Sequence, residues 1–500
     1  MALAYANGAN RLHERLHRYA ALQQVLGQLL MLFSLTMLPP MFVSWLYHDG
    51  ALLAFGTGLW ITFATGAAVW WPARREPVEL KLRDGFLVTV LFWTVLSAFG
   101  AIPLYVSDSG WHTYLDALFE SVSGLTTTGA TVVAHGIDLL PRSINYYRCQ
   151  LHWLGGVGVI VLAVAVLPML GVGGMQLFKA GTPGPMKDAR LTPRIAGTAR
   201  ALWFVYVALT VVCALTFWAL GMSLFDAVCH AMSALSTGGF STHDANIGYF
   251  NNAGIEIACI VFILAGASNF ALHYAAFQER SLSVYPRDSE FLAYVALLLV
   301  FGALVCVPLY TSGIYPDLAT AVRKGFFQLV AYGATGGFST ADPTAWPWYL
   351  PILLVVASFM MSCAGGTGGG VKVVRLLLFV KQAFREMHRL IHPSGELPIK
   401  LDNKVVADSV VYAVGGFFSV YVGMTIALTL AMMLTGLDAV TAFSAVAACI
   451  NNSGHGLGAV HAHMADVTHY GKGILIFTML LGRLEIFTLL IIFTPSFWRR

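Results

Sequence analysis

Several apolar runs in this chain are long enough to cross a lipid bilayer as helices. Examples are residues 86–106, 201–220 and 473–493, and a helix needs about 20 residues to cross the hydrocarbon core. Of the 500 residues, 57% are hydrophobic and only 11% are charged, whereas soluble domains carry roughly a quarter charged residues. The sequence therefore predicts an all-α polytopic membrane protein and argues against a large soluble helical core.

The basic residues mark alternate connections between the apolar runs. Of the 29 Lys and Arg residues, 23 lie in six segments: 11–18, 74–83, 179–200, 280–287, 372–404 and 499–500. The positive-inside rule places such connections in the cytoplasm. The first of them, with Arg11, Arg15 and Arg18, is expected to be a retained cytoplasmic end rather than a cleaved signal peptide.

Charge and cysteine usage give no sign of nucleic acid binding, disulfides or a thiolate metal site. A net charge of +4 gives no indication of nucleic acid binding. The seven cysteines are scattered and form no CxxC pair, so neither a disulfide framework nor a thiolate metal site is indicated. No nucleophile–base set is apparent either, and the sequence does not predict an enzyme.

A repeat of about 100 residues organises most of the chain. Each unit consists of an apolar helix, a shorter semi-polar helix, a loop rich in Gly and hydroxyl residues, and a second apolar helix. The hexamer TGGFST occurs at both 237–242 and 335–340, and TTTGAT at 126–131 and NNSGHG at 451–456 stand at the corresponding places. The glycines aligned on this basis are Gly129, Gly238, Gly336 and Gly454.

Four such units, with an N-terminal helical hairpin at about 20–72, predict a pseudo-fourfold pore built from one chain. The predicted divisions are the hairpin and cytoplasmic start at 1–83, then repeats at 84–196, 197–287, 288–401 and 402–500. Acids are expected at the starts of the short helices of the first, second and fourth repeats: Asp116, Asp226 and Asp438. The third repeat has no acid at comparable spacing.

Loops at membrane depth are tolerated only where they line protein or water, because their backbone groups would otherwise lack partners. Four loops converging on one axis would present rings of backbone carbonyls that replace the hydration shell of a cation. The short helices would point their partly negative C-terminal ends at that cation. Glycine suits such loops because it reaches backbone angles closed to other residues.

The fourfold unit resembles the Trk/Ktr/HKT superfamily of potassium transporters, and most closely the bacterial TrkH-type uptake subunits. The segments that carry the resemblance include LTTTGAT, GGFSTHDANIGYF, TPGPMKDARLTPRIAGTA and NNSGHGLG. It covers nearly the whole chain, including the N-terminal hairpin, which shorter Ktr-type subunits lack. The resemblance implies a multi-pass protein of the bacterial inner membrane that transports K+ and has no covalently bound cofactor. It also implies a homodimer with a cytosolic ring of Rossmann-type nucleotide-binding regulators.

Carried over by position, the resemblance also implies a selectivity filter that holds K+, its only expected metal. The predicted filter residues are Thr127, Thr128 and Gly129; Thr237 and Gly238; Thr335 and Gly336; Asn452, Ser453 and Gly454. Plant relatives that pass Na+ typically have serine at the first-repeat glycine, so Gly129 favours K+. None of the loops has the longer TVGYG run of potassium channels, so looser discrimination is expected, with Rb+ accepted.

A glycine-rich stretch, SCAGGTGGGVK at 362–372, interrupts the outgoing helix of the third repeat. Five glycines in six residues cannot continue a stable helix. The stretch lacks a Walker pattern and a preceding strand, which argues against nucleotide binding; a flexible linker is one alternative. The interpretation supported by the resemblance is an intramembrane gating loop, comprising Gly365, Gly366, Thr367, Gly368, Gly369 and Gly370.

Arg483 lies in the middle of the last apolar run. A charge at that depth is costly and is expected to face protein or water. One alternative is a structural salt bridge, with Glu485 as the nearest acid, although residues two apart point to different faces of a helix. The resemblance places an arginine here below the filter, so Arg483 is predicted to be an electrostatic barrier that the gate modulates.

Other charged or titratable clusters are assigned no specific function. His461, His463 and His469 could form a metal site but are expected to be solvated on an outward-facing loop. Lys187, Arg190 and Arg194 fit the positive-inside pattern. The basic segments at 179–200 and 381–404 are a weaker hypothesis for a regulator docking surface.

The sequence thus predicts a gated, channel-like potassium uptake subunit. The alternative is a symporter that couples K+ to H+ or Na+. A symporter would favour inverted repeats and carboxylates near the membrane midplane. The four repeats here share one orientation, and Glu485 is the one acid near the centre of a span, which favours the channel mechanism.

Overall fold

The computed structural model of the protein describes residues 2–75, 82–165, 191–347, 349–395 and 397–499. Within these residues, regular structure is almost entirely helical, with one short antiparallel pair of strands, β1 (Lys400–Leu401) and β2 (Lys404–Val405). Lys187 and Arg190, predicted above to be cytoplasmic, lie outside the described residues.

Three helices form the N-terminal part of the chain, where a hairpin was predicted: α1 (Ala2–Leu35), α2 (Leu38–Tyr47) and α3 (Leu52–Ala73). α1 and α3 pack closely through glycine. A Cβ added to Gly27 would lie 2.7 Å from the carbonyl oxygen of Gly66, and one added to Gly66 would lie 2.9 Å from that of Gly27. Small residues commonly allow this close approach between helices in membranes.

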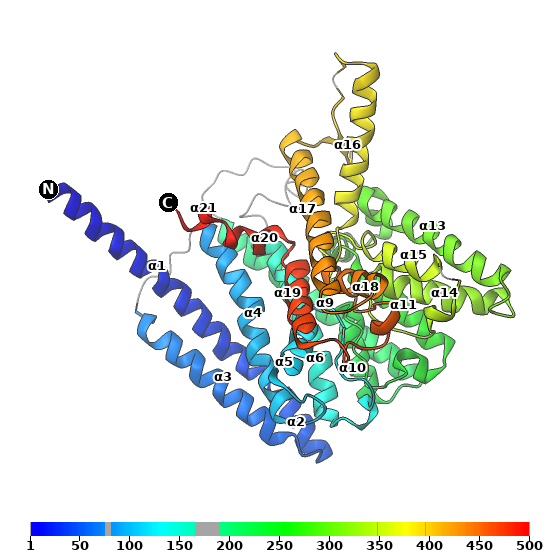
Figure 1. The fold of residues 1–500 in the computed structure, drawn as a ribbon, viewed down its shortest axis with the longest axis horizontal. Coiled ribbons are helices and arrows are strands. Elements are labelled where there is room, and N and C mark those ends of the chain that lie inside the picture. The colour runs from blue at the N-terminus through cyan, green and yellow to red at the C-terminus, as the bar shows by residue number, and fades with distance from the viewer. Residues whose placement is uncertain (1, 76–81, 166–190, 348, 396, 500) are drawn as a thin grey trace. The chain divides into compact units, whose positions relative to one another are not determined.

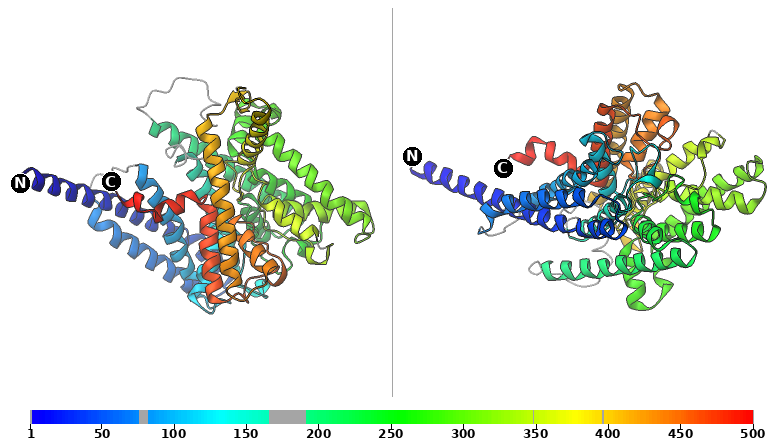
Figure 2. Two further views of the ribbon diagram at one scale, coloured as in Figure 1. Left: turned by 45° about the horizontal axis from the view of Figure 1, so that its top comes forward. Right: turned by 90° about the horizontal axis from the view of Figure 1, so that it is seen from below.

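The four predicted repeats are present, each with an incoming helix, a short pore helix, a loop and an outgoing helix. The incoming helices are α4 (Leu82–Val106), α9 (Leu191–Ala219), α13 (Ser289–Thr311) and α17 (Asp408–Met433). The pore helices are α5 (Tyr114–Leu125), α10 (Leu224–Leu235), α14 (Leu318–Gly333) and α18 (Ala439–Ile450). Figures 1 and 2 show α17 of the fourth repeat running beside the outgoing helix α19.

Of the outgoing helices, α6 (Arg142–Ala165) is continuous over its described length, and the others are interrupted. In the second repeat, α11 (Ala253–Ala267) and α12 (Phe270–Glu279) meet at a bend of 97°. In the third, α15 (Tyr349–Ser358) and α16 (Val373–Ile391) are separated by residues 359–372. In the fourth, α19 (His469–Arg483) is capped by Leu484, and α20 (Phe487–Leu490) follows after a break. Short helical turns complete the connections, namely η1 (Ile137–Leu139), η2 (Asn246–Phe250), η3 (Leu282–Arg287), η4 (Pro343–Ala345), η5 (Gly458–Val460), η6 (Ile491–Phe493) and α21 (Pro495–Trp498).

Six helices among the described residues are long and apolar enough to span a membrane, or up to eight if each bent pair counts as one span. α6 and the pair α15 and α16 are not among them. The first half of α6 is polar, and α15 has only ten residues before the glycine-rich stretch begins. The protein is therefore a multi-pass helical membrane protein, as the apolar runs predicted.

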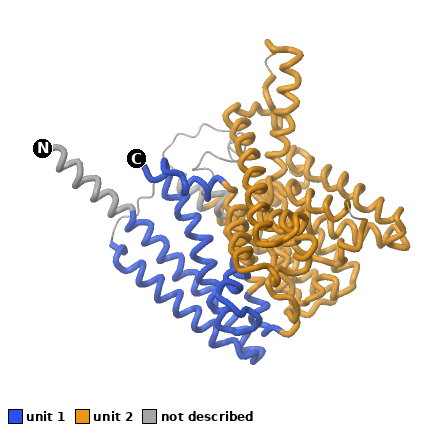
Figure 3. Tube along the Cα trace, viewed as in Figure 1, with its two compact units in different colours: residues 1–122, 140–147, 487–500 blue, residues 123–139, 148–486 orange. Residues whose placement is uncertain are grey.

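Contacts divide the chain into two units, coloured in Figure 3. Unit 1 contains residues 1–122, 140–147 and 487–500, and unit 2 contains 123–139 and 148–486. All four loops that follow the pore helices, the glycine-rich stretch and Arg483 belong to unit 2, so the site described below lies within one unit.

Candidate functional site: four convergent loops and a glycine-rich loop

The four pore helices end at equivalent places. Each helix ends two residues before a non-glycine residue in the left-handed region: Thr127 (φ 53°), Thr237 (φ 53°), Thr335 (φ 53°) and Asn452 (φ 52°). Such angles are uncommon for residues with a side chain. Four nearly identical values at repeat-related positions show that one backbone conformation recurs in all four loops.

Polar side chains cap the starts of the pore helices. Ser223 accepts from the N–H of Asp226 at the start of α10, and Asp438 accepts from Thr441 at the start of α18. The third repeat also has an acidic cap, because α14 begins at Leu318 and Asp317 accepts from the N–H of Thr320 at 2.8 Å. The sequence showed no acid at comparable spacing in this repeat, and Asp317 lies farther from its loop because α14 has 16 residues, whereas each of the other pore helices has 12.

The loops direct their N–H groups back into the pore helices. Thr127, Thr237, Thr335 and Asn452 each donate to a carbonyl three residues earlier, at 3.0–3.2 Å. The N–H groups of Thr128, Gly238 and Ser453 donate five residues back, at 2.8–2.9 Å. These loop N–H groups therefore bond within their own repeat. The loop carbonyls remain able to accept from groups outside the repeat or to face an ion.

The loops approach one another closely through glycine. A Cβ added to Gly129 would lie 2.0 Å from the carbonyl oxygen of Gly238, and one added to Gly337 would lie 2.4 Å from that oxygen. A Cβ on Gly454 would lie 2.3 Å from the carbonyl oxygen of Thr128. The fourth loop therefore meets the first, the first meets the second and the second meets the third, with carbonyl oxygens at the contacts.

The structural register of the glycines differs by one residue from the sequence alignment in two repeats. At the ends of the four pore helices, the glycines with positive φ are Gly129 (83°), Gly239 (90°), Gly337 (69°) and Gly454 (77°). Gly129 and Gly454 therefore correspond to Gly239 and Gly337, rather than to Gly238 and Gly336. Gly238 is restricted for another reason, because a Cβ there would lie 2.0 Å from Nδ1 of His152.

The glycine-rich loop, defined here as residues 362–372, docks on the break between α11 and α12. The N–H groups of Cys363 and Thr367 donate to the carbonyls of Ala267 and Gly266, both at 2.9 Å. The carbonyl of Gly365 in turn accepts from the N–H of Phe270. The helix break frees backbone groups that an unbroken helix would use internally, and the loop satisfies them.

The same loop contacts three of the four pore-helix ends. The hydroxyl of Thr367, which is fully buried, lies 3.0 Å from the carbonyl of Leu235 and 3.3 Å from the hydroxyl of Thr237. The N–H of Gly369 donates to the Thr335 hydroxyl at 3.0 Å. A Cβ on Gly369 would lie 1.9 Å from the carbonyl oxygen of Asn451. The loop is thus packed directly against the ends of the second, third and fourth pore helices.

Arg483 binds the glycine-rich loop rather than forming a simple surface ion pair. Arg483 is 5% exposed, and its guanidinium donates to the carbonyl of Thr367 at 2.8 Å and to that of Gly155 in α6 at 3.3 Å. Glu485, the nearest acid in sequence, forms its salt bridge with Arg375 of α16. The two residues after Leu484 have left-handed backbone angles, so the helix ends just beyond Arg483 and its charge lies close to the last carbonyls of α19.

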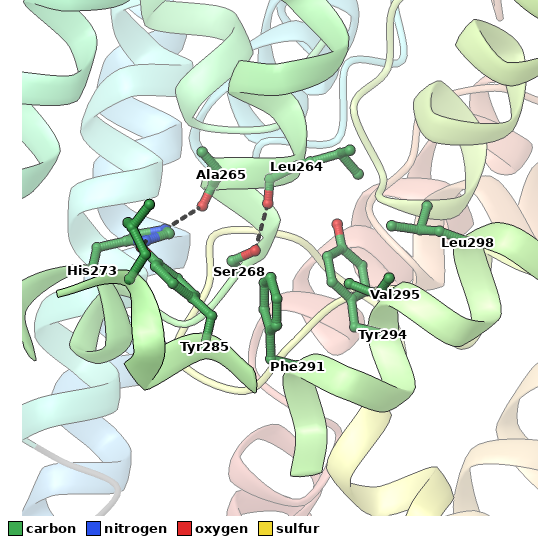
Figure 4. A pocket seen from close by; sticks show the side chains of 10 residues that line it. Leu264, Ala265, Ser268, His273, Tyr285, Phe291, Tyr294, Val295 and Leu298 are labelled. Carbon is green, nitrogen blue, oxygen red and sulfur yellow. Dashed lines mark hydrogen bonds between the residues drawn. The ribbon is translucent and has the colours of Figure 1, made fainter. Parts of the chain in front are cut away.

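A pocket of about 440 Å³ lies beside the bend between α11 and α12 (Figure 4). Its walls are mostly apolar and come from α11, the bend, α12, η3 and α13. Ser268 at the bend donates to the carbonyl of Leu264, and His273 bonds to the carbonyl of Ala265 and to the hydroxyl of Tyr285. These bonds hold the two halves of the broken helix on which the glycine-rich loop docks.

Comparison with known proteins decides the family. The sequence profile of the TrkH family, described as cation transport protein, matches residues 52–500. The Trk system potassium uptake protein TrkH of Halomonas elongata is 50% identical over 479 residues, which cover 95% of this chain and 98% of that protein. Its counterpart of the same name from Escherichia coli K12 is 47% identical, with 96% and 99% covered.

The chain belongs to the TrkH family. The crystal structure of the potassium transporter TrkH from Vibrio parahaemolyticus superimposes with a TM-score of 0.90 at 46% identity, covering 96% of this chain and 100% of that one. The family is one of transport proteins and not of enzymes. The predicted fold class and the predicted family are therefore confirmed.

The structure brings the predicted site residues together around the ends of the pore helices. All ten predicted filter residues lie at or just after the ends of the pore helices. Of the predicted gate residues, Thr367 contacts Thr237 and Gly369 contacts Thr335. The sequence did not identify Arg148 and His152 of α6, which contact the second loop, or Gly239 and Gly337. The repeated Phe of TGGFST, present as Phe240 and Phe338, was a signal that could have indicated a shared packing role.

The histidines of the fourth repeat lie apart in this TrkH-family chain. His461 faces Asp342 at 3.0 Å, while His463 packs edge-to-face on His135. His469 is the first residue of α19 and is exposed. Among the residues that the structure describes, no three His, Cys, Asp or Glu side chains gather closely enough to hold a metal ion.

Proposed function

We propose that this chain is a channel-like potassium uptake subunit in which K+ passes between the four loops. The single observation that carries the proposal is the recurrence of one left-handed backbone conformation at four repeat-related positions, where the loops meet through carbonyls and glycines. The names of its relatives, which are potassium uptake proteins, support the choice of K+.

The proposed filter comprises the loop residues at 127–129, 237–239, 335–337 and 452–454. Carbonyl rings compensate a dehydrated cation for lost water, and the four pore helices add the partly negative ends of their dipoles. K+ is therefore the transported substrate and is held by backbone oxygens. Glycine at the closest contacts keeps the passage free of side chains, which supports an extended row of oxygens rather than a side-chain site.

The proposed gate is the glycine-rich loop together with Arg483. The loop lies against the ends of three pore helices, and Arg483 places a buried positive charge on the same loop. A fixed cation in a low-dielectric region repels a permeating cation. Withdrawal of the loop would unblock the pathway and break the bond between the loop and Arg483. Conduction would then depend on the position of the loop.

The assembly and location that we propose follow from the family. They are a homodimer in the bacterial inner membrane, regulated by a cytosolic ring of Rossmann-type nucleotide-binding subunits. α16 and the strands after it carry the basic segment 381–404, and α16 extends beyond the remainder of unit 2 in Figure 1. This segment and residues 191–200 at the start of α9 are the described parts of the proposed docking surface.

The test is flux through the purified chain in liposomes with imposed K+, Rb+ or Na+ gradients at several pH values. The channel mechanism predicts K+ and Rb+ flux that follows the gradient of the transported ion alone, with Na+ slower. An obligatory requirement for a Na+ or H+ gradient would instead establish the symport alternative. If neither K+ nor Rb+ moves in protein that is folded and monodisperse, the proposed function is wrong.

A further inference from the structure

The second loop is held from the side by one face of α6. Arg148 and His152, four residues apart on that helix, both contact the ring of Phe240. The guanidinium lies over the ring at 4.3 Å, and the imidazole stacks on it with centroids 4.1 Å apart and planes 12° from parallel. Phe240 follows Gly239 directly, so the phenylalanine of TGGFST anchors the loop immediately beyond its left-handed glycine.

Arg148 also links two loops through polar contacts. It is 1% exposed, and it donates to the carbonyl of Ser241 at 3.3 Å and approaches the hydroxyl of Thr131 at 3.5 Å. Thr131 lies two residues beyond Gly129, and Ser241 lies two residues beyond Gly239. The side chain therefore joins the first and second loops at matching positions beyond their glycines.

His152 restrains the second loop at Gly238, before the phenylalanine that both side chains contact. Its Nδ1 lies 3.0 Å from the hydroxyl of Ser233 in α10, and the ring fills the space that a side chain at position 238 would need. The third loop uses a related contact, because Phe338 lies against His230 of α10 with ring centroids 6.1 Å apart. In both TGGFST segments, the phenylalanine packs on a histidine from the repeat before it.

We propose that Arg148 is a specificity-determining positioning residue that sets the outer limit of the ion pathway. Its donation to the carbonyl of Ser241 competes with a permeating cation for that oxygen, and its link to Thr131 fixes the spacing between the first two loops. Discrimination between K+ and Na+ depends on how many carbonyl oxygens surround the ion and how firmly they are held. The proposed effect on ion selectivity rests on the proposed function. The contacts of Arg148 with the two loops do not depend on it.

A buried cation with a carbonyl and an aromatic face as partners is well suited to this role. The guanidinium is planar and can donate and stack at once, which a lysine ammonium cannot do. Burial makes its hydrogen bonds to neighbouring oxygens stronger than in water. Arg148→Lys is therefore expected to retain the charge but to position the loop less firmly.

The experiment compares Rb+ and Na+ flux in liposomes for wild type, Arg148→Gln, Arg148→Lys, Phe240→Leu and the double variant Arg148→Gln/Phe240→Leu. Arg148→Gln is expected to lower the Rb+ to Na+ flux ratio roughly tenfold, since one hydrogen bond to a charged group is lost, and Arg148→Lys is expected to lower it less. Because both side chains hold one loop, the double variant should be little worse than either single variant. Arg142→Gln, on the same helix but outside these contacts, is the matched control.

Thermal unfolding and gel filtration of each variant separate selectivity from folding. A folded Arg148→Gln protein with the wild-type ratio, or a double variant whose losses are fully additive, overturns the proposal. If Arg148→Gln does not fold, Arg148→Lys is tested in its place. A folded Arg148→Lys protein with the wild-type Rb+ to Na+ flux ratio would then overturn the proposal. Absence of Rb+ flux in the wild type would instead contradict the proposed function.

Discussion

The guanidinium of Arg483 donates a hydrogen bond to the backbone carbonyl of Thr367, 2.8 Å away. Arg483 ends α19 of the fourth repeat, and Thr367 is the central residue of the glycine-rich loop of the third repeat. The bond joins the two gate elements that the sequence predicted separately. In the proposed gate, the charge of Arg483 and the glycine-rich loop therefore form one unit, so disturbing either should disturb both.

Arg483→Ala is expected to raise basal K+ or Rb+ flux by at least about tenfold. The variant removes a buried charge and its hydrogen bonds to two carbonyls, each worth roughly 1.5–3 kcal/mol when the donor is charged. Flux in liposomes without regulator measures the effect. Arg385→Ala, which removes a buried arginine paired with Asp408 outside the site, is the matched control. Basal flux unchanged by Arg483→Ala would rule out the barrier.

Thr367→Val should raise basal flux about fivefold. The substitution preserves shape but removes the hydroxyl that lies 3.0 Å from the carbonyls of Leu235 and Gly266. A neutral hydrogen bond contributes about 1 kcal/mol, which corresponds to that factor. Thr367→Ser retains the hydroxyl and should behave as wild type in the same flux measurement. Equal flux in the Val and Ser variants would show that this hydroxyl does not hold the loop.

Gly129→Ala should abolish K+ flux, and Gly136→Ala should not. Both glycines have positive φ, 83° and 90°, so alanine is strained to a similar extent at either position. The added Cβ at 129 would lie 2.0 Å from the carbonyl oxygen of Gly238, whereas the nearest atom at 136 is 3.8 Å away. Rb+ uptake by the two variants, with thermal unfolding as the folding check, separates strain from obstruction. Wild-type flux in Gly129→Ala would show that the close approach of residue 129 to the carbonyl of Gly238 does not lie on the ion pathway.

The connection between the first and second loops should be pH-dependent through His243. Burial lowers the pKa of His243, but hydrogen bonds to Asp226 and Asp138 outweigh burial and raise that pKa above its ordinary value of 6.5. A raised pKa contributes stability that is complete below the ordinary value and is lost as pH rises through the folded value. The ring also stacks on Tyr249 at 3.6 Å and faces His230, while Asp244 accepts from the N–H groups of residues 136 and 137.

The melting temperature of the wild type is therefore expected to fall relative to His243→Gln as pH rises from about 6 to about 9. Thermal unfolding of the detergent-solubilised protein measures this difference. His469→Gln, which changes an exposed histidine, should follow the wild type throughout. Parallel curves for wild type and His243→Gln would show that His243 does not stabilise the connection.

The sequence by itself determined the membrane class, the four repeats and the places of the loops. These features depend on local patterns, namely apolar runs of bilayer length and recurring glycines between them. The glycine-rich interruption at 362–372 was likewise visible, because so many glycines cannot continue a helix. Arg483 was identified because a charge is costly at membrane depth.

Only the tertiary structure decided the register and the partners. Gly239 and Gly337, rather than Gly238 and Gly336, take the left-handed angle, since backbone conformation at a Gly-Gly pair depends on the neighbours that each glycine meets. The bond from Arg483 to Thr367 and the contact of Arg148 with Phe240 join residues 116 and 92 positions apart. Such contacts depend on which carbonyls and rings, distant in the sequence, lie near each guanidinium after packing. No local sequence pattern determines these distances in the folded chain.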